Sequence, residues 1–383
     1  MLNGRTTSGA LALLAALVVF GAALFATASA QQQEQTNDRP RRAGDASPQQ
    51  TPTPRPPADD ETLDEDAVER VETDLTNILF TAIDRGRRFV TFLKRDDVRI
   101  LEDGVEQQIF TFQRETDRPL SLAILIDTSS SQERTLPEEK SAAQRFVDAV
   151  IRPSKDEVAV VSFTGETTLE QGLTGSVARI RRAIERVEFV PPSGYVGGGL
   201  VVTTPGGVGG KGTPPISGEN QSRAGSTAIW DALWVTSREV LSETSDKTRR
   251  AIILLTDGVD TSSRMKLQEA VDGALKADAI IYAIGIGDSF SFDGVDEGSL
   301  NKLTERTGGR AFFPRSEEDL RSAFGQIQDE LRSQYLLAYS PSNKAKDGSF
   351  RKIQLEIVNP QLRGQNIRLT HRQGYFARGG ATK

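Results

Sequence analysis

Short apolar runs alternate with longer amphipathic stretches between Pro119 and Ser333. The runs are mostly apolar, as in strands that are buried on both faces of a sheet. The stretches place their apolar residues on one helical face. The pattern predicts an α/β fold with a doubly wound, mostly parallel sheet. The predicted strands are Leu120–Ile126, Glu157–Phe163, Ala251–Leu255, Ala279–Ile284 and Arg310–Phe313; the predicted helices are Pro137–Val150, one capped by Ser176, Thr227–Leu241, Leu267–Leu275, Glu297–Thr307 and Ser316–Ser333.

The segments on both sides of this region have a β pattern. Asp103-Gly104 between apolar residues indicates a hairpin in the first segment. Neither segment alone has enough strands to close a core, so we expect them to pair into one small β-sandwich that the α/β domain interrupts. The predicted strands are Asp74–Asp84, Phe89–Leu93, Val98–Leu101 and Gln108–Phe112 before the domain, and Tyr335–Tyr339, Lys352–Val358 and Ile367–His371 after it.

The N-terminal residues have the pattern of a secretory signal peptide. An uncharged apolar stretch, Ala10–Ala28, ends in the cleavage-type sequence Ala28-Ser29-Ala30. An uncleaved membrane anchor is the alternative, and no other run is long enough to cross a bilayer. We therefore expect an exported protein that is periplasmic, displayed on the cell surface or secreted. The predicted organisation is a signal peptide (1–30), a disordered Pro/Gln-rich linker (31–66), the first half of the sandwich (67–116), the α/β domain (117–334), the second half of the sandwich (335–377) and a tail (378–383).

The composition leaves oxygen as the main source of functional groups. Among the 383 residues there is no Cys, which excludes disulfides, thiolate metal sites and cysteine nucleophiles. The single His, His371, is predicted in a terminal strand, where a structural role is the simpler interpretation. The net charge of −6 argues against a surface that coats nucleic acid. Phosphate-loop, dinucleotide and Gly-x-Ser-x-Gly patterns are incomplete or absent.

Hydroxyl and carboxyl side chains follow two of the predicted strands. Asp127, Ser129 and Ser131 come directly after Leu120–Ile126, and Asp257 follows Ala251–Leu255. The carboxyl ends of parallel strands share one crevice, so these side chains can meet. Thr227, at the start of a predicted helix, can add one more oxygen. Three hydroxyls and two carboxylates without nitrogen or sulfur favour Mg²⁺ or Mn²⁺ over Zn²⁺.

These residues resemble the metal-ion-dependent adhesion site of von Willebrand factor type A (VWA) domains. Asp127, Ser129 and Ser131 match the Asp-x-Ser-x-Ser pattern of the family, Thr227 its single threonine, and Asp257 its Thr-Asp-Gly aspartate. The resemblance covers roughly residues 119–333 and implies a Rossmann-like fold. The flanks are similar to those of secreted bacterial VWA-related proteins. A Gly/Pro-rich insertion, Pro191–Ala224, departs from the family pattern just before Thr227, and we expect it to be a mobile loop.

Three classes of function are compatible with such a site. The first is a protein-binding, adhesion-type module that is not an enzyme, in which Mg²⁺ (or Mn²⁺) coordinates a carboxylate of a protein partner. The second is a metal-dependent hydrolase, which needs a general base near the ion; beyond Asp260, interpreted as a surface acid, the sequence offers none. The third is a structural metal that stiffens loops. We favour the first.

Overall fold

The computed structural model describes residues 75–115, 117–191, 225–287 and 294–377. The predicted signal peptide, linker and C-terminal tail lie outside the described residues, as does all of the Gly/Pro-rich insertion except Pro191. In these four ranges, no helix is both long enough and apolar enough to cross a membrane.

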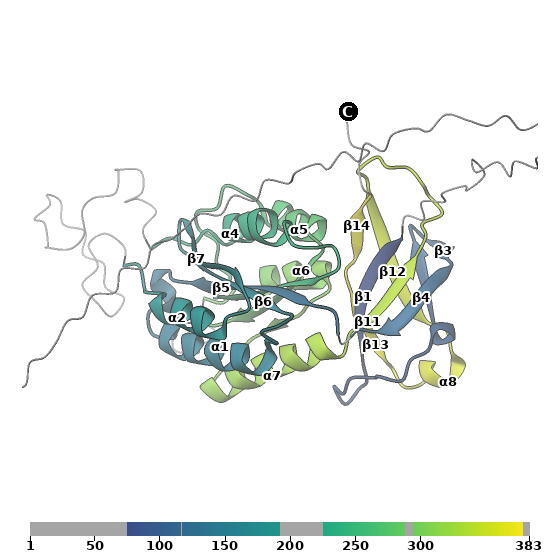
Figure 1. Cartoon of the computed structure of the whole chain (residues 1–383), viewed down its shortest axis with the longest axis horizontal. Helices are drawn as coiled ribbons and strands as arrows, with labels where there is room; N and C mark the ends of the chain where they lie inside the picture. The colour runs from purple at the N-terminus through teal and green to yellow at the C-terminus, as the bar shows by residue number, and fades with distance from the viewer. Residues whose placement is uncertain (1–74, 116, 192–224, 288–293, 378–383) are drawn as a thin grey trace, which may run out of the picture. The chain divides into compact units, whose positions relative to one another are not determined.

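The α/β domain is built on a six-stranded sheet with the strand order β10-β9-β8-β5-β6-β7 (Figure 1). All neighbouring strands are parallel except β7, which runs antiparallel to β6. The strand order reverses between β5 and β8, so the loops that leave these two strands diverge at their carboxyl ends, the place where open α/β sheets generally bind ligands. The strand bounds are β5 (Leu120–Asp127), β6 (Glu157–Phe163), β7 (Thr167–Thr174), β8 (Arg249–Thr256), β9 (Ala279–Gly285) and β10 (Ala311–Phe312).

Helices cover both faces of this sheet, as predicted. In Figure 1, α1, α2 and α7 lie on one face, and α4, α5 and α6 lie on the other. Each face has its own buried apolar cluster, which is what a doubly wound sheet requires. The helices are α1 (Leu136–Val150), α2 (Val177–Arg186), α4 (Ile229–Val235), which continues into the π-helical η4 (Thr236–Leu241), α5 (Leu267–Lys276), α6 (Glu297–Thr307) and α7 (Glu317–Arg332).

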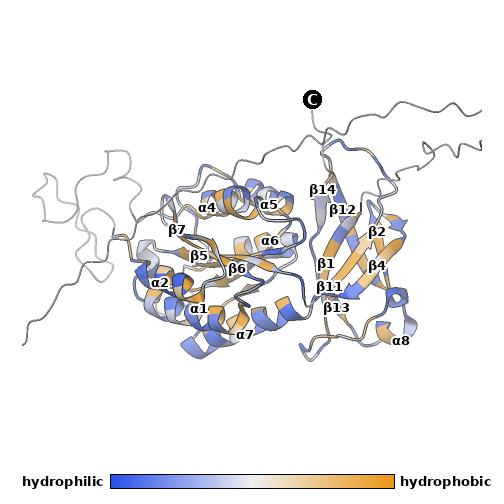
Figure 2. Ribbon diagram, in the orientation of Figure 1, coloured by the Kyte–Doolittle hydropathy of each residue, from blue (hydrophilic) through white to orange (hydrophobic). Residues whose placement is uncertain are grey.

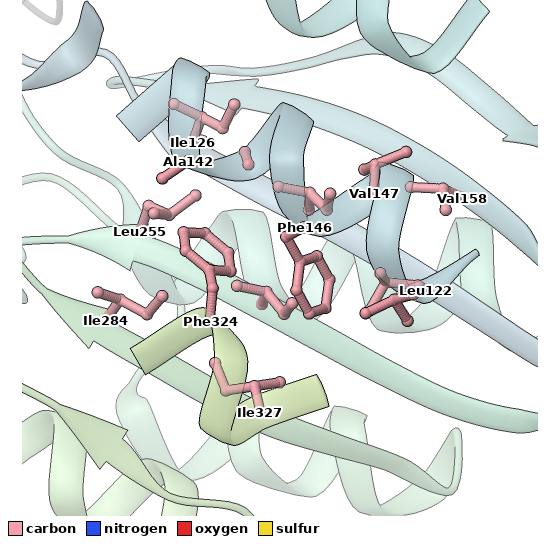
Figure 3. Packing of buried hydrophobic residues seen from close by; sticks show 14 of the residues in the cluster. Leu122, Ile126, Ala142, Phe146, Val147, Val158, Leu255, Ile284, Phe324 and Ile327 are labelled. Carbon is pink, nitrogen blue, oxygen red and sulfur yellow. The ribbon is translucent and has the colours of Figure 1, made fainter. Parts of the chain in front are cut away.

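Packing on the first face joins helices that are far apart in the sequence. Phe146 of α1 and Phe324 of α7 place their ring centroids 5.1 Å apart above the strands (Figure 3). Figure 3 also shows Leu122 and Leu255, from β5 and β8, in the same cluster. The central strands are mostly apolar, and the helices are apolar on one side only (Figure 2). Burial of these faces fixes the sheet and therefore the positions of the strand ends.

The remaining strands form two four-stranded antiparallel sheets, β13-β1-β11-β4 and β14-β12-β2-β3. Both sheets combine strands from the two sides of the α/β domain, since β1 pairs with β11 and β2 pairs with β12. One buried cluster, which includes Ile78, Ile100 and Ile353, lies between them. The fold class predicted from the sequence is confirmed. The bounds are β1 (Thr76–Ile83), β2 (Val98–Glu102), β3 (Val105–Gln107), β4 (Ile109–Arg114), β11 (Tyr335–Tyr339), β12 (Phe350–Ile357), β13 (Arg368–His371) and β14 (Gly374–Phe376), with the short helices η2 (Arg95–Asp97) and α8 (Pro360–Arg363).

Local predictions for the sandwich have mixed outcomes. The hairpin is confirmed: Asp103 and Gly104 have φ of 49° and 84° and connect β2 to β3. The predicted strand Phe89–Leu93 is wrong, because only Phe89 makes an isolated bridge, to Ile83. The Tyr335 hydroxyl holds this segment instead, donating to the Val90 carbonyl and accepting from the Leu93 amide, both at 3.0 Å.

Candidate metal centre

The first group of site residues follows β5 at the point where the strand order reverses. Asp127 is the last residue of β5 and is completely buried. Its Oδ1 accepts a hydrogen bond from the Ser129 amide at 2.9 Å, and its Oδ2 accepts one from the Thr256 hydroxyl at 2.5 Å. Thr256 is the last residue of β8. The carboxylate therefore joins the ends of two neighbouring strands and orients the loop that carries the serines.

The two serines of the motif lie side by side. Ser129 Oγ and Ser131 Oγ are 3.2 Å apart, and Ser129 is almost fully buried. Ser131 lies in the turn η3 (Ser130–Gln132), and Asp257, the residue after β8, is close enough for its charge to raise the pKa of Asp127. The structure thus brings Asp127, Ser129, Ser131 and Asp257 together, although more than a hundred residues separate the two aspartates along the chain.

Asp257 makes the same local hydrogen bond as Asp127. Its Oδ1 accepts the amide of Val259, two residues on, at 2.9 Å. Gly258 has φ of 84°, and a Cβ there would lie 2.8 Å from Leu300 Cγ. Glycine is therefore required after Asp257, because a side chain would face both a strained backbone and a clash.

Thr227 reaches the same edge of the sheet through the loop that carries Asp257. The Thr227 amide donates to Thr261 Oγ1 at 2.8 Å, and its carbonyl accepts the amides of Thr261 and Ser262 at 2.9 and 3.0 Å. Ser130 Oγ also donates to the Gly225 carbonyl at 3.4 Å. The turn before α4 is thus tied to both other loops. All five predicted ligands belong to segments that these hydrogen bonds hold together.

Asp260 anchors this loop, and its interpretation as a surface acid needs correction. Its Oδ1 accepts the amide of Ile229, the first residue of α4, at 2.8 Å and the Ser263 hydroxyl at 2.6 Å. The side chain is half-buried. Asp260 therefore fixes the start of α4, and so Thr227, against the loop of Asp257. The sequence did not reveal this because Ile229 precedes Asp260 by 31 residues.

The electrostatics of the pair of aspartates fit a cation. Burial, and then the charge of Asp257, raise the pKa of Asp127 to about 7; burial raises the pKa of Asp257 as well. Among the described residues, neither aspartate takes part in an ion pair. Two buried like charges without a counter-charge repel each other, and a divalent cation between them removes that repulsion. The oxygen-only donor set suits Mg²⁺ or Mn²⁺.

Three buried polar residues near this site had not been recognised in the sequence. Gln132, Thr135 and Glu139 are each at most 1% exposed. Gln132 Nε2 donates to the Ile286 carbonyl at 3.1 Å, and Thr135 Oγ1 donates to Glu139 Oε1 at 2.8 Å. Glu139 lies on the buried face of α1 between Leu136 and Ala142. The sequence signal for this group was Glu139, an acidic residue at a position of the amphipathic helix where the pattern predicts an apolar one.

Comparison with family models gives two matches. Residues 122–202 and 216–326 each match a model described as von Willebrand factor type A domain. The two matches together span about half of the 383 residues. No curated protein matches the chain in sequence.

Solved structures with a similar fold come from distant organisms. A von Willebrand factor type A protein from Catenulispora acidiphila is 14% identical, with a TM-score of 0.43, and the match covers 82% of this chain and 76% of that one. BatB from Bacteroides thetaiotaomicron is 16% identical, with a TM-score of 0.39, and the match covers 56% of this chain and all of the other. Proximal thread matrix protein 1 from the mussel byssus, solved with a zinc-occupied adhesion site, is 21% identical, with a TM-score of 0.44 and 60% of this chain covered. The present chain spans about half the length of the mussel protein.

Proposed function

We propose that this chain, which belongs to the von Willebrand factor type A family, is an exported protein-binding module whose metal ion coordinates a carboxylate of its partner. The observation that carries the proposal is the buried pair Asp127 and Asp257, two repelling acids that share one loop cluster with three hydroxyl groups. Such a pair lowers the stability of a protein that binds nothing, because both charges lose their hydration. A cation converts the same pair into a binding site.

The proposed ligands are oxygens at the carboxyl ends of two strands and the start of one helix. Mg²⁺ or Mn²⁺ would be held by Asp127, Ser129, Ser131, Thr227 and Asp257, directly or through water. Two carboxylates neutralise the formal charge of the ion. Five protein groups leave one octahedral position for an outside ligand, and a hard cation favours an anionic oxygen there. A side-chain carboxylate of a partner protein has this chemistry.

The metal is tested first, on the full exported chain. Calorimetric titration with Mg²⁺, Mn²⁺ and Zn²⁺ should show one site per chain for the first two ions. Zn²⁺ is included as a competitor, because divalent affinity rises from Mn²⁺ toward Zn²⁺ at most oxygen and nitrogen sites and the mussel protein was solved with zinc. No binding of any of the three ions would end the proposal.

Binding is then compared with hydrolysis. The chain is immobilised and incubated with an envelope fraction in Mg²⁺, in chelator, or in Mg²⁺ with excess glutarate as a free carboxylate competitor. We expect partner capture only in Mg²⁺ without competitor. Capture that persists in chelator would assign the metal a structural role at most, and metal-dependent turnover of simple ester or phosphate substrates would favour the hydrolase.

A further inference from the structure

Glu139 is a completely buried carboxylate in the first turn of α1. Its Oε1 accepts the hydrogen bond from Thr135, whereas Oε2 has no hydrogen-bond partner among the residues that the structure describes. A buried acid that is left half unsatisfied costs free energy, whether it carries a charge or a proton. The position on the helix is otherwise part of an apolar face, so packing alone gives no reason for a glutamate there.

A line of buried side chains connects Glu139 to the strand end before a proposed metal ligand. Thr135 Oγ1 lies 2.8 Å from Glu139 Oε1 and 3.1 Å from Gln132 Oε1. Gln132 Nε2 in turn donates to the Ile286 carbonyl at 3.1 Å, and the Ile286 amide donates at 2.9 Å to the carbonyl of Thr256, the residue before Asp257. Sequence separations of three and four residues put Gln132, Thr135 and Glu139 on one side of the turn that enters α1. The start of the helix is thereby tied to the strand end that precedes Asp257.

The charge of Glu139 also reaches the metal site. Burial raises the pKa of Glu139 to about 8, and the charges of Asp127 and Asp257 both contribute to the rise. In the part of the chain that the structure describes, no three acidic or histidine side chains come close enough to hold one ion together. Glu139 is therefore too distant to serve as a third carboxylate ligand, but close enough to act on a cation through its field.

We infer that Glu139 is a positioning residue of the metal centre, one that supports the strand end before Asp257 through Thr135 and Gln132 and, once a bound cation has displaced its proton, supplies a third buried negative charge that strengthens cation binding. This inference rests on the proposed metal site. Carboxylates that orient or charge a metal ligand from outside the coordination sphere commonly change affinity by about 10–100-fold.

The chain offers a matched control in Glu330 of α7. Glu330 is also buried, at 1% exposure, and its Oε1 accepts the Thr81 hydroxyl at 3.3 Å. It differs in having a counter-charge, since Arg310 lies 3.2 Å from its Oε2. The adjacent Leu331 carbonyl accepts from Arg249, at the opposite end of β8 from Asp257. Replacing Glu330 therefore tests the loss of a buried acid away from the metal site.

The experiment measures Mn²⁺ affinity by calorimetry for the full wild-type chain, Glu139→Gln, Glu139→Asp, Thr135→Val and Glu330→Gln. We expect Glu139→Gln to weaken binding by about tenfold or more. Glu139→Asp should recover most of the affinity because it keeps the charge, Thr135→Val should show a smaller loss, and Glu330→Gln should bind as the wild type does.

The outcomes separate this inference from the proposed function. If the wild type binds Mn²⁺ and Glu139→Gln binds it with equal affinity, the inference is overturned, but the proposed metal site is not. If Glu139→Gln does not fold, Thr135→Val decides, and unchanged affinity there overturns it. An equal loss in Glu330→Gln assigns the effect to general destabilisation and overturns it as well. No Mn²⁺ binding by the wild type overturns both proposals.

Discussion

The two domains both bury carboxylates, but they surround them differently. In the sandwich, Glu102 accepts hydrogen bonds from the hydroxyls of Tyr339 and Tyr375 and pairs with Arg351, which is itself 2% exposed. In the α/β domain, Asp127 accepts from a hydroxyl and a backbone amide, has no counter-charge among the described residues, and is repelled by a second aspartate. One carboxylate has a counter-charge within the protein, and the other has none among the described residues, which is the basis of the proposed metal site.

The two carboxylates differ in whether their surroundings in the folded chain satisfy them. The Glu102 cluster joins β2, β11, β12 and β14, which come from both sides of the α/β domain. Its partners satisfy both oxygens, so the cluster has no capacity left for a ligand. The Asp127 site keeps its repulsion, which a folded protein tolerates when a ligand relieves it. A buried acid without a counter-charge is therefore better evidence for a binding site than burial alone.

The largest expected effect is a loss of stability in the sandwich when Glu102 loses its counter-charge. Arg351→Ala removes the counter-charge of Glu102 and should lower the free energy of unfolding by about 3–5 kcal/mol, because an unpaired charge stays buried. Urea unfolding measures the loss. Arg99→Ala is the control: Arg99 pairs with Glu356 at 2.7 Å on the adjacent strands but is 41% exposed, so its loss should be much smaller than that in Arg351→Ala. Equal losses would mean that burial of the pair is irrelevant.

The second prediction concerns the buried carboxylate of the α/β domain, Asp127. Asp127→Asn keeps the shape of the side chain but removes its charge, so Mg²⁺ affinity should fall by about 100-fold or more. The metal-free protein should be as stable as the wild type or more so, because the repulsion with Asp257 disappears. Calorimetry and metal-free melting curves measure the two effects. A large loss of metal-free stability would show that Asp127 is structural, like Glu102.

The third prediction concerns how stability changes with pH, because buried carboxyl groups without a counter-charge hold their protons in the folded state. The folded, metal-free protein holds protons on Asp127 and Glu139 up to about pH 7 and 8, whereas the unfolded chain releases them near 3.8 and 4.5. The folded state thus binds more protons across this window, and its stability should fall as the pH rises from about 4 to 8. Saturating Mg²⁺ should reduce the fall, because the cation replaces the protons.

Urea unfolding at several pH values, with chelator and with Mg²⁺, measures this slope. The double variant Asp127→Asn/Glu139→Gln is the control, since it lacks both titrating groups but keeps all others. Its stability should change less with pH than that of the chelated wild type. If the two slopes coincide in chelator, these carboxyl groups are not the source of the pH dependence.

The fold could be predicted where burial leaves a direct trace in the sequence. β5 and β8 are buried at every position, so they read as continuous apolar runs and were found to within a few residues. β7 was missed because it is a polar edge strand in which Leu169 is exposed. The apolar residues Val90 and Leu93 were taken for a strand, but Tyr335, distant in the sequence, binds them instead.

The site was predictable for a similar reason. Asp127, Ser129, Ser131 and Asp257 follow buried parallel strands, so topology alone brings them to one edge. Glu139 and Asp260 could not be predicted in the same way, because their roles depend on partners that only the folded chain brings near. Glu139 interacts with Asp257 across the sheet edge, and Asp260 with the start of a preceding helix.

The smallest expected effect compares two aspartates with the same local bonding, one in each domain. Asp260 accepts the Ile229 amide and the Ser263 hydroxyl, and Asp97 accepts the Lys94 amide and the Asn359 side-chain amide, at 2.8 and 2.7 Å. Replacing either by Ala should lower the free energy of unfolding by about 1 kcal/mol, since each change removes one backbone and one side-chain hydrogen bond.

Of these two replacements, only the one at Asp260 should change the affinity for the metal ion. Asp260→Ala removes the bond to Ile229, the one nearest to Thr227 at the start of α4, and leaves the contacts of Thr261, Ser262 and Ser263 in place, so the threonine oxygen is less well positioned. We expect Mg²⁺ affinity to fall by about threefold to tenfold in Asp260→Ala and to stay unchanged in Asp97→Ala. Asp260→Asn can still accept the Ile229 amide and should recover the affinity. Parallel losses in the two alanine variants would show that metal binding follows overall stability, whereas a loss confined to Asp260 would show that the loop geometry controls it.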